Sequence, residues 1–165
     1  MTRLSDFQAE ALTGEQVDLN DYEGRVVLVV NTASQCGLAP QFEGLEQLHR
    51  EFQDDGLVVL GFPSDSFKQE HETAEEIAEA CQRNYGVSFP MMAKVPVNGP
   101  DTHPVFKWLK NEKKGMIGGA IKWNFTKFLI GRGGSVLERY APTTTPDQLR
   151  GDIERALAEP AGAAA

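Results

Sequence analysis

The 165-residue chain has the composition of one globular domain, with 41% hydrophobic and 24% charged residues. Its 16 basic and 24 acidic residues give a net charge of -8, which argues against nucleic acid and anionic membranes as main partners. No apolar run approaches the roughly 20 residues that a membrane span needs, and the N-terminus has no apolar signal core. We therefore expect a single cytoplasmic domain over residues 1–165, with a frayed tail at 160–165.

Strands and helices are predicted to alternate in the first half of the chain. A short hairpin within residues 4–24 precedes Val26–Asn31, a continuous apolar strand of the kind that is buried on both faces of a sheet. Apolar residues at helical spacing then predict an amphipathic helix from about Pro40 to Gln53. A second buried strand follows at Leu57–Phe62, and the crossover between the two strands is long enough to make them parallel.

The second half is predicted to add three helices and an antiparallel hairpin. A helix is expected from a capping box at Thr73 to about Tyr85, followed by one short strand within Phe89–Val97 and a helix over Thr102–Asn111. A glycine-rich loop at Gly115–Ala120 then leads to two strands, Phe125–Ile130 and Val136–Tyr140, which are joined by a glycine turn. The last helix is expected to start from a capping box at Thr145. The lysines between positions 107 and 127 are expected to form a solvated face rather than a docking face, with Lys107, Lys110, Lys113 and Lys114 pointing outward. This order is typical of the thioredoxin-like fold, an α/β layout with a mixed central sheet and helices on both faces.

Cys36 lies where a buried strand gives way to a helix. Free backbone N–H groups and the positive end of the helix dipole stabilise a thiolate at such a junction, and the thiolate is the reactive form of cysteine. Cys36 and the polar loop Pro63–Glu72 both follow predicted parallel strands, at the sheet edge where sites form. A buried, inert cysteine is the alternative. Position 39 is alanine, which excludes a Cys-x-x-Cys dithiol centre.

Neither a metal site nor a bound cofactor is expected. The chain has two cysteines and three histidines, and their spacing is not that of metal ligands.

The stretch around Cys36 closely resembles the signature of the glutathione peroxidase family in its cysteine-containing form. It reads Asn31-Thr-Ala-Ser-Gln-Cys-Gly-Leu-Ala-Pro-Gln-Phe-Glu-Gly-Leu. The resemblance runs from about residue 5 to 157 and continues through Gly61-Phe62-Pro63, Asn84-Tyr85-Gly86-Val87-Ser88-Phe89-Pro90-Met91, Val97-Asn98-Gly99-Pro100, Lys122-Trp123-Asn124-Phe125-Thr126-Lys127-Phe128 and Ala141-Pro142-Thr143-Thr144. Several motifs in the right order make the match specific.

The resemblance assigns the family's catalytic tetrad. Cys36 matches the peroxidatic residue, Trp123 and Asn124 match the Trp-Asn pair, and Gln69 matches the glutamine. An indole N–H and two amides can stabilise a thiolate and a developing alkoxide without quenching the nucleophile. The family's loop usually reads Phe-Pro-Cys-Asn-Gln-Phe-Gly-x-Gln-Glu; here it is one residue shorter, with Ser64 for the Cys and Ser66 for the Gln. A solvated loop position for Gln69 and a core position for Trp123 are the alternatives.

Cys81 lies inside the predicted helix that ends near Tyr85, where a packed, inert cysteine is one interpretation. Family members that use thioredoxin carry a resolving cysteine at this position, before Asn-Tyr-Gly-Val-x-Phe-Pro. The resemblance therefore implies that Cys81 attacks oxidised Cys36 and forms an intramolecular disulfide. The helix would have to unwind locally for this reaction. The segment between Leu109 and Trp123 is short, as in monomeric members of the family.

The resemblance implies a thiol peroxidase that reduces hydrogen peroxide and organic or lipid hydroperoxides, with thioredoxin as the reductant. Glutathione as reductant, with one active cysteine, is a close alternative. A peroxide sensor or redox relay that passes its disulfide to a partner protein would use the same residues. A thioredoxin-fold binding module without chemistry is disfavoured, because all four residue types of the tetrad are present.

Overall fold

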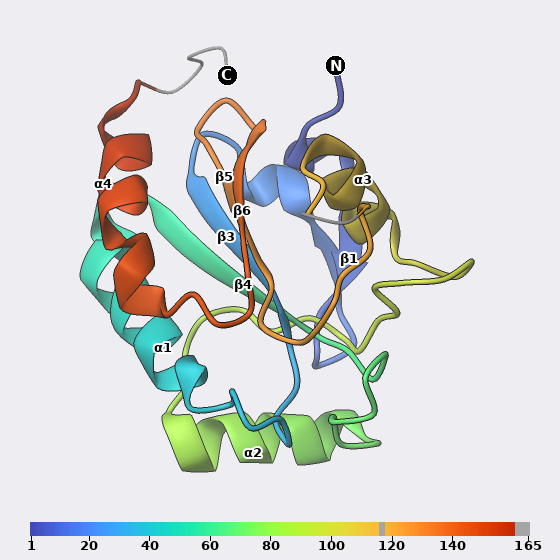
Figure 1. The fold of residues 1–165 in the computed structure, drawn as a ribbon. Coiled ribbons are helices and arrows are strands. Elements are labelled where there is room, and N and C mark those ends of the chain that lie inside the picture. The colour runs from blue at the N-terminus through green and yellow to red at the C-terminus, as the bar shows by residue number, and fades with distance from the viewer. Residues whose placement is uncertain (116–117, 161–165) are drawn as a thin grey trace.

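A computed structural model describes residues 1–115 and 118–160, and it shows helices packed on both faces of a central sheet (Figure 1). The sheet has the strand order β4-β3-β5-β6, formed by β4 (Leu57–Pro63), β3 (Val26–Thr32), β5 (Lys127–Ile130) and β6 (Val136–Tyr140). β3 pairs in parallel with β4 and antiparallel with β5, and β5 pairs antiparallel with β6. The predicted mixed sheet is therefore confirmed. β1 (Gln8–Glu10) and β2 (Gln16–Asp18) form the separate opening hairpin.

β3 divides the hydrophobic core in two. All seven of its residues are buried, and they alternate between the two faces of the sheet. Val26, Leu28 and Val30 pack in the core with α1 (Gln41–Phe52) and α4 (Arg150–Ala158). Val27 and Val29 pack in the core with α3 (Pro104–Glu112). This two-sided burial explains why the strand reads as a continuous apolar run rather than as an alternating one.

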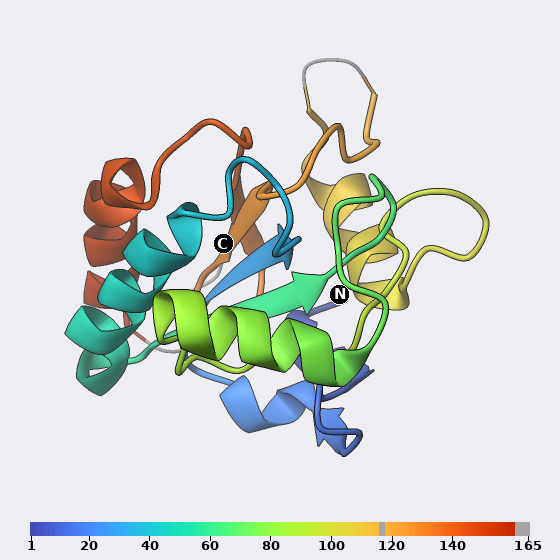
Figure 2. The same ribbon diagram turned by 90° about the horizontal axis from the view of Figure 1, so that it is seen from below.

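α2 (Ala74–Tyr85) lies across the end of the sheet where β3 and β4 finish (Figures 1 and 2). The predicted capping box is present, because Thr73 Oγ1 accepts from the Glu76 N–H and the Glu76 carboxylate accepts from the Thr73 N–H, both at 3.2 Å. Gly86 ends the helix with a φ of 59°, the left-handed conformation that favours glycine. Ile77 and Cys81 are the buried residues of α2. Few apolar contacts therefore hold this helix along its length.

Two predicted strands differ from the structure. Phe89–Val97 was expected to contain a strand, but it makes only isolated bridges, from Met91 to Gly61 and from Met92 to Ala11. Pro90 and Pro96 lack the N–H that a ladder requires, so pairing cannot continue through them. The strand expected from Phe125 begins at Lys127, because Phe125 has a φ of 67°, outside the extended range.

The expectation that Lys110 points outward is wrong. Its Nζ donates to the carbonyl oxygen of Val97 at 2.7 Å and to Asn98 Oδ1 at 3.2 Å. The last predicted helix begins as the 3-10 turn Pro146–Leu149 before α4. Residues 116–117 of the predicted glycine-rich loop and residues 161–165 of the predicted frayed tail lie outside the described residues. Across the part of the chain that is described, no helix has both the length and the apolar character needed to cross a membrane.

Candidate active site

Cys36 lies in the turn between the end of β3 and the start of α1, and its side chain is 5% exposed. The turn is closed by backbone hydrogen bonds, in which the Cys36 N–H donates to Ala33 and the Ala39 N–H donates to Cys36. The Leu38 N–H is directed at the sulfur, with a distance of 3.4 Å from nitrogen to Sγ. The donor to the sulfur is thus a backbone N–H of the turn, because α1 begins only at Gln41 and its end does not reach Cys36, contrary to the sequence prediction.

The loop that carries Gln69 is attached to the residue before Cys36. The Gln35 N–H donates to the carbonyl oxygen of Gln69 at 2.9 Å. Ser64 and Ser66, the two departures from the family's loop, bond to each other between hydroxyls at 3.0 Å, and Ser66 Oγ also accepts from the Val97 N–H at 3.2 Å. These bonds close the shortened loop. Gln69 Oε1 is buried without a partner among the described residues, so it remains available to a ligand or to water.

Asn31, at the end of β3, holds the turn that carries Trp123 and Asn124. Its Oδ1 accepts from the Thr126 N–H at 3.1 Å, and its Nδ2 donates to the carbonyl oxygen of Trp123 at 3.3 Å. Its backbone oxygen accepts from the Phe125 N–H at 2.7 Å. The turn is therefore fixed to the strand that leads to Cys36. Sequence reasoning missed this role of Asn31, although the residue opens the recognised signature.

Asn124 and Trp123 differ in how far their side chains are exposed to solvent at this end of the sheet. Asn124 is fully buried, and both atoms of its side-chain amide lack partners within the described residues. An unpaired buried amide costs on the order of 1–3 kcal/mol, so a polar ligand or water is expected against it. Trp123 is 37% exposed, and its ring lies 5.2 Å from that of Phe67 on the Gln69 loop. Three loops thus meet here, one after β3, one after β4 and one before β5.

Cys81 lies on the buried face of α2 and belongs to the same hydrophobic cluster as Cys36. Both cysteines are free thiols. Burial, with a smaller contribution from the charge of Glu70, raises the pKa of the Cys81 thiol to about 12. Cys81 is therefore protonated, and unreactive as a nucleophile, while α2 stays packed.

Glu70 is a buried side chain beside the site that sequence reasoning missed. Its Oε1 accepts from the Ser34 N–H at 3.1 Å, from the His71 N–H at 2.9 Å and from the Ser34 hydroxyl. The available signal was its position directly after Gln69, which matches the Gln-Glu that ends the family's loop. Both residues of that pair contact the turn that carries Cys36, Gln69 through Gln35 and Glu70 through Ser34.

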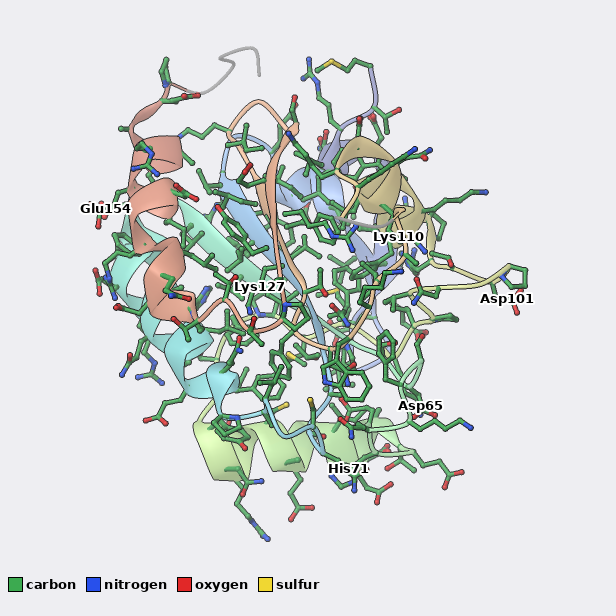
Figure 3. All side chains as sticks on the ribbon, in the orientation of Figure 1. Asp65, His71, Asp101, Lys110, Lys127 and Glu154 are labelled. Atoms are coloured by element: carbon green, nitrogen blue, oxygen red, sulfur yellow. The ribbon has the colours of Figure 1, made fainter. Side chains whose placement is uncertain are left out.

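Lys127 was included among the lysines expected on a solvated face, and this expectation is wrong. It is fully buried at the start of β5, because the strand register places it opposite Val30 of β3. It lies inside the molecule, whereas Asp101 and Glu154 lie at the periphery (Figure 3). Its Nζ donates to the carbonyl oxygens of Pro142 at 3.0 Å and Thr144 at 2.6 Å. Burial lowers the pKa of Lys127 to about 7. The ammonium therefore ties the loop after β6 to the strand that follows the Trp123–Thr126 turn.

We predict that the stability of the reduced protein rises as the pH increases from 7 to 9. The unfolded chain keeps the Lys127 proton up to its ordinary pKa of 10.5, whereas the folded chain releases it near pH 7. The free energy of unfolding should therefore increase by up to about 2 kcal/mol over this interval. Urea denaturation at several pH values measures the effect. In a Lys127→Met variant, the free energy of unfolding should no longer rise with pH over this interval. A rise equal to that of the wild type would contradict the prediction.

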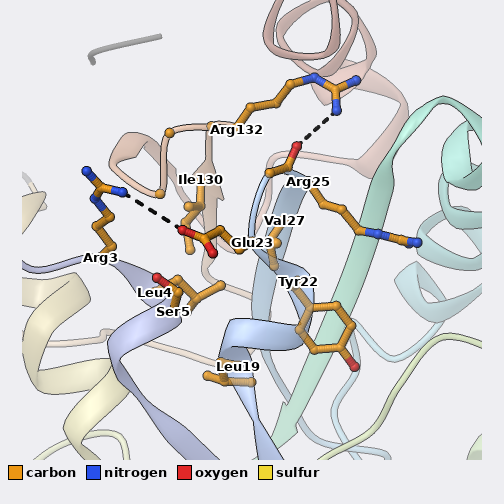
Figure 4. A pocket seen from close by; sticks show the side chains of 14 residues that line it. Arg3, Leu4, Ser5, Leu19, Tyr22, Glu23, Arg25, Val27, Ile130 and Arg132 are labelled. Carbon is orange, nitrogen blue, oxygen red and sulfur yellow. Dashed lines mark hydrogen bonds and ion pairs between the residues drawn. The ribbon is translucent and has the colours of Figure 1, made fainter. Parts of the chain in front are cut away.

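Two of the surface hollows formed by the described residues lie at opposite ends of the sheet. One, of about 710 Å³, borders the turn that carries Trp123 and is lined by Lys114, Gly115, Lys122, Thr126, Arg139, Ala141 and Pro142. The other, of about 330 Å³, lies near the start of β3 (Figure 4). Arg3 pairs with Glu23 at 4.0 Å there, and Arg132 donates to the carbonyl oxygen of Gly24 at 3.0 Å. Of these two, the first borders the turn that carries Trp123 and Asn124.

Comparison with protein families matches residues 4–110 to the family described as glutathione peroxidase. A glutathione peroxidase of Lactococcus lactis subsp. cremoris is 52% identical over 153 residues, covering 92% of this chain and 98% of the relative. A Synechocystis protein named hydroperoxy fatty acid reductase gpx1 is 51% identical, covering 92% and 94%. A Schizosaccharomyces pombe protein named glutathione peroxidase-like peroxiredoxin gpx1 is 46% identical, covering 95% and 100%.

Solved structures agree in fold. The crystal structure described as Trgpx in apo form has a TM-score of 0.82 and 42% identity, covering 98% of this chain and 99% of that one. A thiol:disulfide interchange protein of the thioredoxin family from Chlorobium tepidum has a TM-score of 0.68 at 16% identity, covering 92% and 93%. The predicted thioredoxin-like fold is thus confirmed, since the likeness extends to a neighbour with little sequence in common.

Proposed function

The chain belongs to the glutathione peroxidase family and is a hydroperoxide-reducing thiol peroxidase, and we propose that Cys36 is its peroxidatic residue and Cys81 its resolving residue. The observation that supports this most is the set of neutral polar groups around the Cys36 turn. The Leu38 N–H donates to the sulfur, while Asn124 keeps both amide atoms, and Gln69 its acceptor Oε1, without partners among the described residues.

In the first step, the Cys36 thiolate attacks one oxygen of the hydroperoxide. A bond forms between sulfur and oxygen, the O–O bond breaks, and the alkoxide or hydroxide that leaves is protonated to an alcohol or to water. The Leu38 N–H stabilises the thiolate. The Trp123 indole and the amides of Gln69 and Asn124 donate to the oxygen on which negative charge develops. All these donors are neutral, so they do not protonate the nucleophile.

In the second step, the Cys81 thiolate attacks the sulfur of the Cys36 sulfenic acid. A disulfide forms, the S–O bond breaks, and the hydroxide that leaves becomes water. Burial raises the pKa of Cys81 to about 12, so the packed helix holds an unreactive thiol. Because α2 buries little besides Ile77 and Cys81, its local opening costs less than opening of the core. Opening would both release Cys81 and let it ionise.

We propose thioredoxin as the reductant, because a dithiol protein reduces an intramolecular disulfide by exchange. The S. pombe relative's name, a peroxiredoxin, is in keeping with a cysteine-based cycle. The test is steady-state hydroperoxide reduction with thioredoxin, its reductase and NADPH in one arm and glutathione with its reductase in the other. Turnover with thioredoxin should exceed that with glutathione by about tenfold or more. Equal or faster turnover with glutathione would refute this choice of reductant.

Hydroperoxides with an apolar tail and an anionic end are proposed substrates alongside hydrogen peroxide. The 710 Å³ hollow adjoins the Trp123 turn, and exposed Lys114 and Lys122 stand at its border. Arg139 is less available, because it donates to the carbonyl oxygens of Lys113, Gly119 and Ala120. The Synechocystis relative is named for the reduction of a hydroperoxy fatty acid. These two lysines would supply the cations for the carboxylate, and Ala141 and Pro142 an apolar surface for the tail.

We predict that Lys122→Glu raises the KM for linoleic acid hydroperoxide by about tenfold, because reversing the charge turns attraction of the carboxylate into repulsion. The KM for hydrogen peroxide, which has no anionic end, should change by less than about twofold. Steady-state kinetics with both substrates measure the difference. Lys107→Glu makes the same charge reversal on α3, away from the hollow, and serves as the control. An equal effect on the two substrates would contradict the proposed carboxylate site.

A cytoplasmic monomer is also proposed. The short segment between Leu109 and Trp123 supports the monomer, since it resembles that of monomeric members of the family. Reducing surroundings would keep Cys36 and Cys81 as the free thiols that the cycle needs. Sedimentation of the reduced and the peroxide-treated protein tests the oligomeric state.

A further inference from the structure

Glu70 connects the turn that carries Cys36 to the start of α2. Its Oε1 accepts from the N–H and the hydroxyl of Ser34, two residues before Cys36, and from the N–H of His71. Its Oε2 is buried without a partner among the described residues. A single buried carboxylate therefore links the segment that leads into Cys36 to the segment that leads into α2.

α2 is held mainly at its two ends. Lys94 Nζ donates to the carbonyl oxygens of His71 and Glu72, both at 3.1 Å, just before the helix begins. Beyond its end, the Glu46 carboxylate of α1 accepts from the Ser88 N–H at 2.7 Å. Release of Cys81 would therefore bend the chain near these two attachments. Glu70 precedes both attachments in the chain and is bonded to Ser34 of the Cys36 turn.

We propose that Glu70 is a positioning residue: through Ser34 it keeps Gln69 and the Cys36 turn in their reactive arrangement, also while α2 opens to release Cys81. This inference rests on the proposed roles of Cys36 and Cys81. The proposal is supported by two neighbouring sets of hydrogen bonds between these segments. The Gln35 N–H donates to the Gln69 carbonyl oxygen, and the N–H and hydroxyl of Ser34 donate to the Glu70 carboxylate. Without the second, the bond from the Gln35 N–H would be left to hold Gln69 to the Cys36 turn, since the Ser64 N–H bond to the Thr32 carbonyl lies at the far end of the loop. A displacement of about 1 Å is enough to slow an aligned reaction severely.

The test uses the full-length reduced protein and one equivalent of hydrogen peroxide, so that each step is measured once. Cys36 oxidation is followed by rapid trapping of the sulfenic acid, and disulfide formation by acid quench and mass spectrometry. Glu70→Ala should slow Cys36 oxidation by about tenfold or more. Glu70→Gln should restore it to within about threefold of wild type, because the amide oxygen still accepts from Ser34. Glu72→Gln, an exposed carboxylate two residues on, is the matched control and should change neither step.

A mutant cycle separates positioning from a general loss of stability. If Glu70 acts through Ser34, the double variant Ser34→Ala/Glu70→Ala should oxidise Cys36 no more slowly than Glu70→Ala alone. Amide exchange across α2 should stay within about threefold of wild type in Glu70→Gln. Additive losses in the double variant would overturn the proposal, as would a Glu70→Ala protein that oxidises Cys36 at the wild-type rate. Failure of the wild-type Cys36 to react with peroxide would instead refute the proposed function.

Discussion

A Cys36→Ser protein is expected to lose hydroperoxide reduction by about 10⁴-fold or more in kcat/KM while keeping its fold. A serine hydroxyl stays protonated at neutral pH, so the Leu38 N–H, 3.4 Å from the sulfur in the wild type, has no anion to stabilise. The exchange of one atom at a nearly buried position leaves the surrounding turn intact. Peroxide consumption with the thioredoxin system measures the loss, and thermal denaturation checks the fold.

The matched control for this prediction is Ala39→Ser, which introduces a hydroxyl at another buried position of the same turn. It should retain activity to within about tenfold, since it removes no reacting atom. A Cys36→Ser protein that consumed peroxide at the wild-type rate would contradict the peroxidatic role of Cys36. That result would favour the alternative interpretation, a thioredoxin-fold binding module without chemistry.

The sequence was sufficient to predict the elements that local pattern determines. β3 and β4 read as continuous apolar runs because both of their faces are buried. Thr73 and Glu76 predicted the start of α2, and Gly86 predicted its end. These residues form hydrogen bonds with the free backbone groups of the helix ends, so the signal is local in the sequence. The position of Cys36 between a strand and a helix followed from the same local signals. Its suggested chemistry came from the resemblance as well as from that position.

Side chains that act across long sequence distances were not predictable in this way. Lys127 reads as one of several lysines, and its burial follows from the register that pairs it with Val30. Glu70 can be matched to the Gln-Glu that ends the family's loop, but its bond to Ser34 is not visible in the sequence. Lys68, directly before Gln69 in the shortened loop, adopts a φ of 58°, which a sequence does not reveal for a residue other than glycine.

Cys81→Ser is the second prediction with a large effect, and it should separate the two halves of the cycle. The first oxidation of Cys36 should proceed within about threefold of the wild-type rate, because Cys81 supplies no donor to that step. Turnover driven by thioredoxin should fall by about 100-fold or more, since no intramolecular disulfide can form. Stopped-flow oxidation with one equivalent of peroxide and steady-state assays measure the two quantities. Ala80→Ser, the neighbouring position on α2, controls for a hydroxyl in this helix.

Peptide mapping after peroxide treatment gives the complementary test of Cys81. The wild type should yield a Cys36–Cys81 disulfide, whereas sulfenic or sulfinic Cys36 beside a free Cys81 would contradict the resolving role. Strong turnover of Cys81→Ser with glutathione would favour the cycle with one active cysteine. Mixed disulfides trapped on Cys36 of that variant would favour a relay to a partner protein. In either case the high pKa of Cys81 would reflect a packed helix residue alone, and α2 would have no need to open.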